Sequence, residues 1–364
     1  MIKEKSANNS KRVVIGKSLV RREYLNELKK AWRGQRLVLF LGAGVSAPYG
    51  LANWTDLVLD LLLNESEKFE QFWPHYRKAL ALWMTDYFDF SPLALARVVK
   101  YKLRRSAESI SSDQQRRDFL SLVHESLYST FNENPTGTTA LRTIAKMVAK
   151  SERSRNGRRI QAVFTANFDN VLEMELEKVG VPIRPIYDGR RQTENELRVV
   201  HVHGYLPRNG EIPNVDLVFT EDEYHRLSYS AFHWALSEII SSLRNYTVLF
   251  VGLSMSDPNL RRLLDASYTP SQRPAHFLLR RDYDLPPAAR HRAIRIVNEY
   301  AEEQARRANL EMKTKSDVSR AIDVMLKQAH QYDRELFKDM GLGTIWVNEF
   351  DDIPKILTEI TNTR

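Results

Sequence analysis

Residues 37–46 read Leu-Val-Leu-Phe-Leu-Gly-Ala-Gly-Val-Ser, an unbroken apolar run that stops at a glycine-rich turn. An apolar run without polar alternation is typical of a parallel strand that is buried on both faces of its sheet. Glycines at the carboxyl end of such a strand leave main-chain N–H groups open to a phosphate. The stretch therefore predicts a nucleotide-binding loop made by Gly42, Ala43, Gly44 and Ser46, with a plain tight turn as the structural alternative.

The residues after this loop argue against a dehydrogenase. Residues 42–47 fit the dinucleotide fingerprint, but Pro48, Tyr49 and Gly50 interrupt the helix that a dehydrogenase starts directly from the loop. A dehydrogenase also needs an acidic residue at the end of its second strand, whereas Asp56 and Asp60 lie in a helical pattern over residues 54–63. The sequence therefore predicts a longer phosphate loop.

The composition is that of an ordinary globular protein. The chain has 364 residues and is 43% hydrophobic, enough for one large core or two moderate ones. It has no cysteine, which excludes disulfides, thiolate nucleophiles and cysteine-bound zinc. No apolar segment approaches the roughly 20 residues of a membrane-spanning helix, and residues 1–20 lack a secretory signal pattern. We expect a cytoplasmic protein with no membrane contact.

The formal net charge is +8, which raises the question of a nucleic-acid partner. The basic residues are dispersed in short clusters, mostly near acidic residues, and lack the interleaved aromatic residues of a single-strand-binding groove. This distribution is typical of solvated helix faces and loops. We therefore do not expect direct binding of nucleic acid.

Apolar runs alternate with helical patterns along the chain, which predicts an α/β fold with a Rossmann-like, mostly parallel sheet, helices on both faces and helical insertions. The further strands are expected at residues 160–164, 198–202, 247–251, 276–279 and 344–347. We expect a basic flexible arm at residues 1–18 and a single nucleotide-binding domain at residues 19–364, with a helical insertion at 65–150 and a helical excursion at 285–340.

Polar residues follow three of the later strands, and the carboxyl ends of parallel strands meet at one crevice. After the first of these strands come Asn167 and Asp169. Asp169 is equally suited to cap the following helix and to contact a ligand. Asn167 lies earlier in the turn and is the better candidate for a functional role.

The next strand ends in His201-Val202-His203-Gly204, where the two histidines face the same side of an extended chain. Two histidines without cysteine or a nearby carboxylate make a poor metal site, so we expect no metal. His203 lies where the strand gives way to a loop and suits a general base, whereas His201 suits a core histidine that bonds the main chain.

A second turn rich in glycine and serine follows the strand at residues 247–251. Alone it is a loop. Together with the first glycine-rich turn, Gly252, Ser254 and Asp257 offer groups that can contact ribose or phosphate on the far side of the crevice.

In this order and spacing, the turns resemble the sirtuin-like family of NAD-consuming proteins. The residues that carry the resemblance are Gly42-Ala43-Gly44-Val45-Ser46 with Gly50, Thr165-Ala166-Asn167-Phe168-Asp169, His203-Gly204, Leu217-Val218-Phe219-Thr220 with Tyr224, and Gly252-Leu253-Ser254 with Asp257. The resemblance implies NAD as substrate, with its diphosphate on the first loop and its nicotinamide ribose beside Asn167 and Asp169. It implies Asn167 and His203 as the catalytic residues.

The chain departs from deacetylase sirtuins because it lacks their four-cysteine zinc module. In this it resembles prokaryotic sirtuin-like effectors of antiphage defence, which deplete NAD in abortive infection. The resemblance implies an NAD⁺ glycohydrolase that releases nicotinamide and ADP-ribose, a homo-oligomer, and a motor ATPase partner encoded nearby. Two alternatives stay open: a non-catalytic NAD or ADP-ribose sensor or scaffold, and a zinc-less deacylase or ADP-ribosyl transferase.

Overall fold

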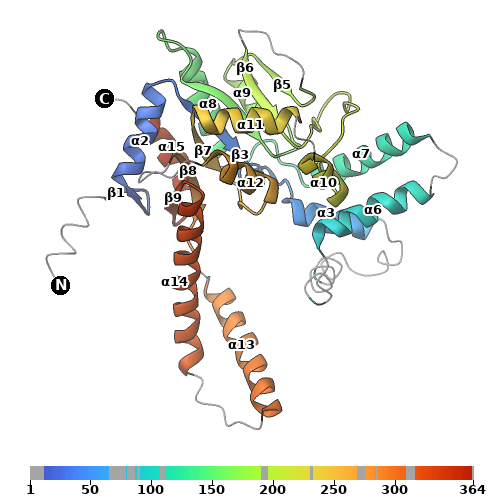
Figure 1. Ribbon diagram of the computed structural model, residues 1–364, viewed down its shortest axis with the longest axis vertical. Coiled ribbons are helices and arrows are strands. Elements are labelled where there is room, and N and C mark those ends of the chain that lie inside the picture. The colour runs from blue at the N-terminus through green and yellow to red at the C-terminus, as the bar shows by residue number, and fades with distance from the viewer. Residues whose placement is uncertain are drawn as a thin grey trace.

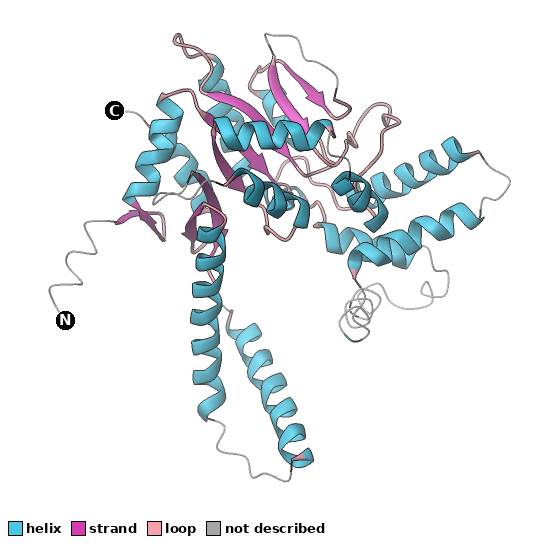
Figure 2. Ribbon diagram, in the orientation of Figure 1, coloured by secondary structure: helices cyan, strands magenta, loops and turns pink. Residues whose placement is uncertain are grey.

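The computed structural model describes residues 12–64, 91–106, 111–189, 196–229, 233–268, 275–283, 286–308 and 316–362, with the single residues Ala79 and Tyr87. Its centre is a seven-stranded parallel sheet in the order β5-β6-β4-β3-β7-β8-β9 (Figures 1 and 2). The strands are β3 (Leu37–Leu41), β4 (Ile160–Thr165), β5 (Ile183–Ile186), β6 (Leu197–His201), β7 (Thr247–Val251), β8 (His276–Arg281) and β9 (Leu342–Val347). The predicted α/β, Rossmann-like fold is confirmed.

Helices cover both faces of this sheet because alternate strand residues point to opposite sides. Leu37, Leu39 and Leu41 of β3 belong to one buried cluster, whereas Val38 and Phe40 belong to another. The first cluster lies under α2 (Arg22–Arg33), α3 (Trp54–Asn64), α7 (Ser112–Tyr128), α8 (Ala140–Glu152), α9 (Val171–Lys178) and α15 (Asp352–Thr361). The second lies under α10 (Glu221–Tyr229), α11 (Trp234–Asn245), α12 (Pro258–Ser267) and the end of α14 (Ser316–Asp339).

The order of the strands places a switch point at β3. This strand pairs with β4 on one side and with β7 on the other. The chain leaves β3 to build β4, β5 and β6, and then crosses back to build β7, β8 and β9. Ligands of open α/β sheets bind at the carboxyl ends of the strands beside such a point, and the glycine-rich turn begins there.

Most strands lie within two residues of their predicted bounds, but β5 was missed. It has the sequence Ile-Arg-Pro-Ile, and Pro185 lacks the N–H that a central strand needs. The strand lies at the edge of the sheet, paired with β6 alone, where proline is tolerated. Because the strand is short and contains a proline, it lacks the apolar run by which the other strands were predicted.

The prediction of a flexible arm over residues 1–18 is wrong for residues 12–18. β1 (Arg12–Ile15) and β2 (Ser18–Arg21) form an antiparallel hairpin. The Lys17 main-chain N–H and the Ser18 hydroxyl donate to Oδ2 of Asp352, at 2.9 and 2.6 Å. These contacts hold the hairpin against α15, more than 330 positions away in sequence. Residues 1–11 lie outside the described part of the chain.

Two groups of helices extend beyond the sheet. Within residues 65–150, where an insertion was expected, α6 (Pro92–Ser106) and α7 pack near α3, while residues 65–78 lie outside the described residues. The helix α8 differs from this expectation because it packs against α9 and α15 and covers the sheet.

Near the C-terminus, α13 (Pro287–Arg307) and α14 form a helical hairpin that projects from the body (Figure 1). In the described ranges, no helix combines the length and apolarity that crossing a bilayer requires.

Candidate active site

The glycine-rich turn after β3 packs closely against the turn after β7. The N–H groups of Gly42 and Gly44 donate to the carbonyl oxygens of Val251 and Gly252, at 3.0 and 2.9 Å. A Cβ at Gly42 would lie 2.7 Å from the Gly252 oxygen, and a Cβ at Gly252 would lie 2.7 Å from the main-chain nitrogen of Val45. These glycines are therefore needed to bring the two loops together.

This packing corrects the expectation that the N–H groups of the turn are open to a phosphate. The N–H groups of Val45 and Ser46 are also occupied, by the carbonyl oxygens of Gly42 and Ala43, in a short 3-10 turn (Ala43–Val45). The predicted extension of the loop forms a second 3-10 turn (Ala47–Tyr49). Ala43 is half-buried and Gly44 is exposed, so the outer edge of the turn is the part that a ligand can reach.

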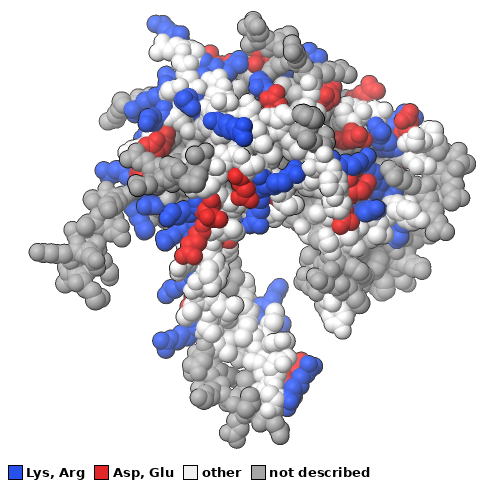
Figure 3. Space-filling model, viewed as in Figure 1, with Lys and Arg blue, Asp and Glu red and all other residues white. Residues whose placement is uncertain are grey.

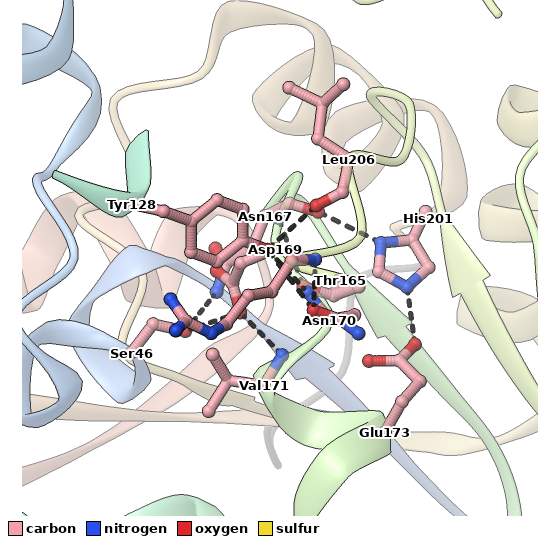
Figure 4. Close-up of polar contacts among 11 residues, drawn as sticks. Ser46, Tyr128, Thr165, Asn167, Asp169, Asn170, Val171, Glu173, His201 and Leu206 are labelled. Atoms are coloured by element: carbon pink, nitrogen blue, oxygen red, sulfur yellow. Dashed lines mark hydrogen bonds and ion pairs between the residues drawn. The ribbon is translucent and has the colours of Figure 1, made fainter. Parts of the chain in front are cut away.

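Asn167 is held on three sides at the carboxyl end of β4 (Figure 4). Its side-chain Nδ2 donates to the Gly42 carbonyl oxygen at 3.3 Å and to the Ser46 hydroxyl at 3.1 Å. Its main-chain N–H donates to the Thr165 hydroxyl at 3.0 Å, and its carbonyl oxygen accepts from Nδ1 of His201 at 3.0 Å. The Asn167 amide is therefore fixed against the glycine-rich turn, as its predicted position required.

Asp169 serves both of the roles that the sequence left open. Its Oδ1 accepts from the main-chain N–H of Val171 at 3.1 Å, in the first turn of α9, and from the Ser46 hydroxyl at 3.2 Å. The side chain is buried, and burial raises its pKa to about 6, although these two hydrogen bonds act in the opposite direction. A carboxyl group with a pKa near neutrality, adjacent to Asn167 through Ser46, is suited to acid–base or electrostatic work.

His201 and Glu173 form a buried pair beside Asn167 (Figure 4). Nδ1 of His201 donates to the Asn167 carbonyl oxygen, and Nε2 lies 2.6 Å from Oε1 of Glu173. Burial lowers the pKa of His201, but the charge and hydrogen bond of Glu173 outweigh burial, so this pKa lies above its ordinary value. The raised pKa favours the doubly protonated imidazolium, which can donate from both nitrogens. The sequence analysis predicted its main-chain bond but wrongly expected no carboxylate near the histidines.

His203 faces a different carboxylate. Its Nε2 lies 3.3 Å from Oδ2 of Asp257, and its ring packs edge-on against Tyr224 with the centroids 5.6 Å apart. Oδ1 of Asp257 accepts from the N–H groups of Asn259 and Leu260, at 2.8 and 3.4 Å, and so caps α12. Burial raises the pKa of Asp257, but His203 and these two bonds outweigh it and place the pKa below its ordinary value. Asp257 therefore orients His203, and its predicted contact with the cofactor stays a prediction.

Ser254 lies apart from both groups. Its hydroxyl is 2.6 Å from that of Ser256, both side chains are exposed, and its carbonyl oxygen accepts from Arg280 at 2.9 Å. A contact between Ser254 and ribose or phosphate stays a prediction.

The site consists of two polar groups at the carboxyl edge of the sheet. One joins Asn167, Ser46 and Asp169 to the glycine-rich turn, and the other joins His203 to Asp257. Within the described residues, no hydrogen bond or ion pair links the Asn167 side chain to that of His203. They follow the neighbouring parallel strands β4 and β6, and the contact of Gly42 and Gly44 with Gly252 connects the turns that carry the two groups. The catalytic roles of Asn167 and His203 stay predictions.

Comparison with known protein families finds one match. Residues 161–306, which run from β4 to the end of α13 and include Asn167, His203 and Asp257, match the family model described as SIR2-like domain. This part of the chain is therefore similar to sirtuin-like domains, and the similarity fits an NAD-utilising enzyme. No curated protein matches the sequence.

Glu173 is the site residue that the sequence analysis did not find. It lies in the first turn of α9, where an acidic residue is favoured by the helix dipole, and nothing in the local pattern sets it apart from a surface residue. Its pairing with His201 depends on how α9 packs beside β6, 28 positions along the chain. Such a contact has no local sequence signal.

Proposed function

We propose that this chain hydrolyses NAD⁺ to nicotinamide and ADP-ribose. The observation that carries the proposal is the arrangement at the switch point of the sheet, where Asn167 is bonded to the glycine-rich turn and His203 is paired with Asp257. The reaction is balanced as NAD⁺ plus water giving nicotinamide, ADP-ribose and one proton. The bond between ribose C1′ and the nicotinamide nitrogen breaks, and the oxygen of water bonds to C1′.

Asn167 positions the reacting ribose or water in this proposal. Its Nδ2 is committed to Gly42 and Ser46, which turns Oδ1 into the acceptor available to a bound hydroxyl group. The main-chain bonds to Thr165 and His201 keep the amide from rotating away. Fixed groups of this kind lower a reaction barrier because their orientation is already established before substrate binds.

His203 accepts the proton in this proposal. The carboxylate of Asp257 faces its Nε2, so the tautomer that carries hydrogen on Nε2 is favoured and Nδ1 keeps the lone pair that takes a proton. Asp257 then stabilises the imidazolium that forms. Asp169, with a pKa of about 6, is mostly ionised at neutral pH and supplies negative charge near the ribose as positive charge develops there.

Water is the acceptor that the chain favours over an acyl-lysine peptide. The sequence contains no cysteine and therefore no four-cysteine zinc module of the deacetylase type. We further propose, from the resemblance to defence effectors, that this activity depletes cellular NAD during infection. A motor ATPase encoded nearby is the proposed partner that restrains or triggers it.

The test is release of nicotinamide from NAD⁺ by the purified chain without peptide or protein substrate, followed by chromatography. We expect Asn167→Ala and His203→Ala each to lower kcat by about 100-fold or more, the usual contribution of a positioned general base or orienting group. Asn245→Ala and His225→Ala are the matched controls. They remove the same chemical groups, an amide and an imidazole, from exposed positions. We expect both controls to keep wild-type activity.

Other outcomes separate the alternatives. Binding of NAD⁺ without nicotinamide release would support a sensor or scaffold and contradict hydrolysis. Release that requires an acylated peptide, or that yields ADP-ribosylated protein in place of free ADP-ribose, would support a deacylase or a transferase. Activity that persists in both Asn167→Ala and His203→Ala would disprove the assignment of this site.

A further inference from the structure

Asn259, two residues after Asp257, is a buried polar side chain without a role in the proposed reaction. It lies in the first turn of α12 and is 5% exposed. Its Oδ1 accepts from the Ser228 hydroxyl of α10 at 2.5 Å, but its Nδ2 has no hydrogen-bond partner among the described residues. Buried polar atoms of native proteins are nearly always paired, either with another residue or with an internal water. Nδ2 of Asn259 therefore indicates a further partner.

The charged surface gives no comparable signal. Basic and acidic side chains are interspersed on the face of the molecule in view (Figure 3). Interspersed charges of this kind are typical of a solvated surface, so the partner of Asn259 is to be found in the interior.

A small cavity lies beside the Asn259 side chain. Its volume is about 10 Å³, close to the space that one water molecule needs. Three polar residues line it, namely His203, Asp257 and Asn259, and the other lining residues are all apolar. A cavity of this size with two or more polar partners can hold a water, whereas a purely apolar one stays dry. It is too small for a ribose or a nicotinamide ring, so the ligand that fits it is water.

Asp257 offers the second partner that such a water needs. Its Oδ1 already accepts from two main-chain N–H groups of α12, whereas its Oδ2 faces Nε2 of His203 at 3.3 Å. This distance is longer than the usual N–H···O distance of about 2.9–3.0 Å, and a carboxylate oxygen has two acceptor positions. Oδ2 can therefore accept from a water as well as from His203.

We propose that Asn259 is a positioning residue for His203, and that it acts through one internal water. The water oxygen accepts from Nδ2 of Asn259, and one water hydrogen is donated to Oδ2 of Asp257. With Oδ1 bonded to the main chain of α12 and Oδ2 bonded through the water to Asn259 of the same helix, the carboxylate cannot rotate away from the imidazole. This role rests on the proposed hydrolysis, in which Asp257 orients His203 as the base.

The first test examines the water itself and needs no NAD⁺. In a high-resolution crystal structure of the full chain, we expect one ordered water within hydrogen-bond distance of Nδ2 of Asn259 and Oδ2 of Asp257. Asn259→Leu keeps the number of side-chain heavy atoms but removes the donor, and we expect it to lose this water. We also expect the pKa of Asp257, followed by ¹³C NMR, to rise in this variant because a hydrogen bond to the ionised carboxylate is lost.

The second test measures hydrolysis of NAD⁺. We expect Asn259→Leu to lower kcat about fivefold with KM unchanged, the effect of losing roughly one hydrogen bond that orients the base. Asn259→Ser keeps a hydroxyl donor and leaves room for a second water, so it should stay within about twofold of wild type. The control is Leu264→Met, a volume-conserving change in the same helix outside the cavity lining, which should keep wild-type kinetics.

Ala235→Val removes the water without changing any of the three polar residues. Ala235 of α11 lines the same cavity, and the two added methyl groups occupy the space of the water. We expect this variant to lower kcat about as much as Asn259→Leu does. The double variant Asn259→Leu/Ala235→Val should be no slower than either single variant, because both changes remove the same contact.

A wild-type cavity without ordered water would overturn the proposal. So would an Asn259→Leu protein that keeps the wild-type kcat and gains free energy of unfolding, the outcome expected when an unpaired amide is removed from a dry cavity. A wild-type chain that binds NAD⁺ but releases no nicotinamide would contradict the proposed hydrolysis, and with it the role of Asn259 in catalysis. The water and the pKa of Asp257 are measured without NAD⁺, so the two failures are distinguishable.

Discussion

Two histidines lie two positions apart at the end of the same strand and meet opposite environments. His201 is fully buried between the Asn167 carbonyl oxygen and Glu173, whereas His203 lies beyond the strand beside Asp257 and Tyr224. Both have a carboxylate partner. The difference lies in the other nitrogen. In His201 it donates to the main chain, whereas in His203 it has no hydrogen bond to the residues that the structure describes.

This difference teaches that the partner of a histidine does not by itself assign its role. The carboxylate beside His201 raises the pKa of that ring and fixes its position, so the pair supports the turn that carries Asn167. The carboxylate beside His203 is itself fixed at the start of α12, so it holds that ring in one orientation at the carboxyl edge of the sheet. The predictions below test whether the first pair acts on stability and the second on activity.

The largest effect is expected from His201→Ala. The substitution leaves the Glu173 carboxylate buried without its cation, and Oε2 of Glu173 already has no hydrogen-bond partner among the described residues. Removing one partner of a buried ion pair lowers the free energy of unfolding by about 3–5 kcal/mol. Urea unfolding at pH 7 measures this loss. We expect His203→Ala to lower the free energy of unfolding by less than His201→Ala does, because its partner Asp257 keeps two main-chain hydrogen bonds.

The control for this experiment is the pair of substitutions His201→Ala/Glu173→Ala. It removes both charges, so it should recover at least half of the stability that His201→Ala loses. The pH dependence provides a second check. Because the pKa of His201 is raised in the folded protein, its contribution to stability is complete below the unfolded pKa and is lost as pH rises through the folded pKa. A loss of stability in His201→Ala that is the same at all pH values would contradict the charged pair.

The second effect is expected from Asp169, whose pKa is about 6 in the folded protein against 3.8 for an unperturbed aspartate side chain. Since burial penalises its ionised form, the carboxyl group stabilises the fold most below the unfolded pKa and loses that contribution as pH rises through about 6. As pH rises from 4 to 7, we expect the free energy of unfolding of Asp169→Asn to increase by about 2–3 kcal/mol relative to that of wild type. Paired urea titrations of the two proteins measure this difference. An Asp169→Asn curve that runs parallel to wild type would exclude the raised pKa.

The fold could be predicted well because most strands of the sheet and the helices between them have recognisable local sequence patterns. The apolar runs of β3 and β7 end at glycine, and the helices between strands carry apolar residues at helical spacing, so each element was predicted from its own residues. The hairpin of β1 and β2 and the edge strand β5 were missed, since their positions depend on contacts with Asp352 and with β6. A contact between distant segments leaves no local periodicity.

The candidate site was predicted unevenly for the same reason. Residues that follow strands, such as Asn167 and His203, could be identified by their positions in the chain. The partners could not: Glu173 for His201, Asp257 for His203 and Gly252 for the glycine-rich turn all come from other elements. The sequence analysis therefore missed that Asp257 and the glycines join parts of the protein, while their contacts with a ligand stay predictions.

The smallest effect is expected from Asp257→Asn, which separates the two roles of this residue. Asparagine keeps the oxygen that caps α12, so the free energy of unfolding should stay within about 0.5 kcal/mol of wild type, whereas Asp257→Ala loses the cap and about 1 kcal/mol. The neutral amide no longer supplies a negative charge to the imidazolium that His203 forms when it takes a proton. Under the proposed hydrolysis we expect kcat to fall about tenfold with KM unchanged, because the lost interaction exists only once the proton has moved.

The matched control for this prediction is Asp265→Asn, on the exposed side of the same helix, which should keep wild-type kinetics. If Asp257 instead bound the substrate directly, as the sequence first indicated, Asp257→Asn would raise KM and leave kcat less affected. If Asp257 were only a helix cap, Asp257→Asn would be silent and Asp257→Ala would lower stability alone. The comparison of the two variants therefore decides whether the carboxylate beside His203 acts on the reaction, on the substrate or on the fold.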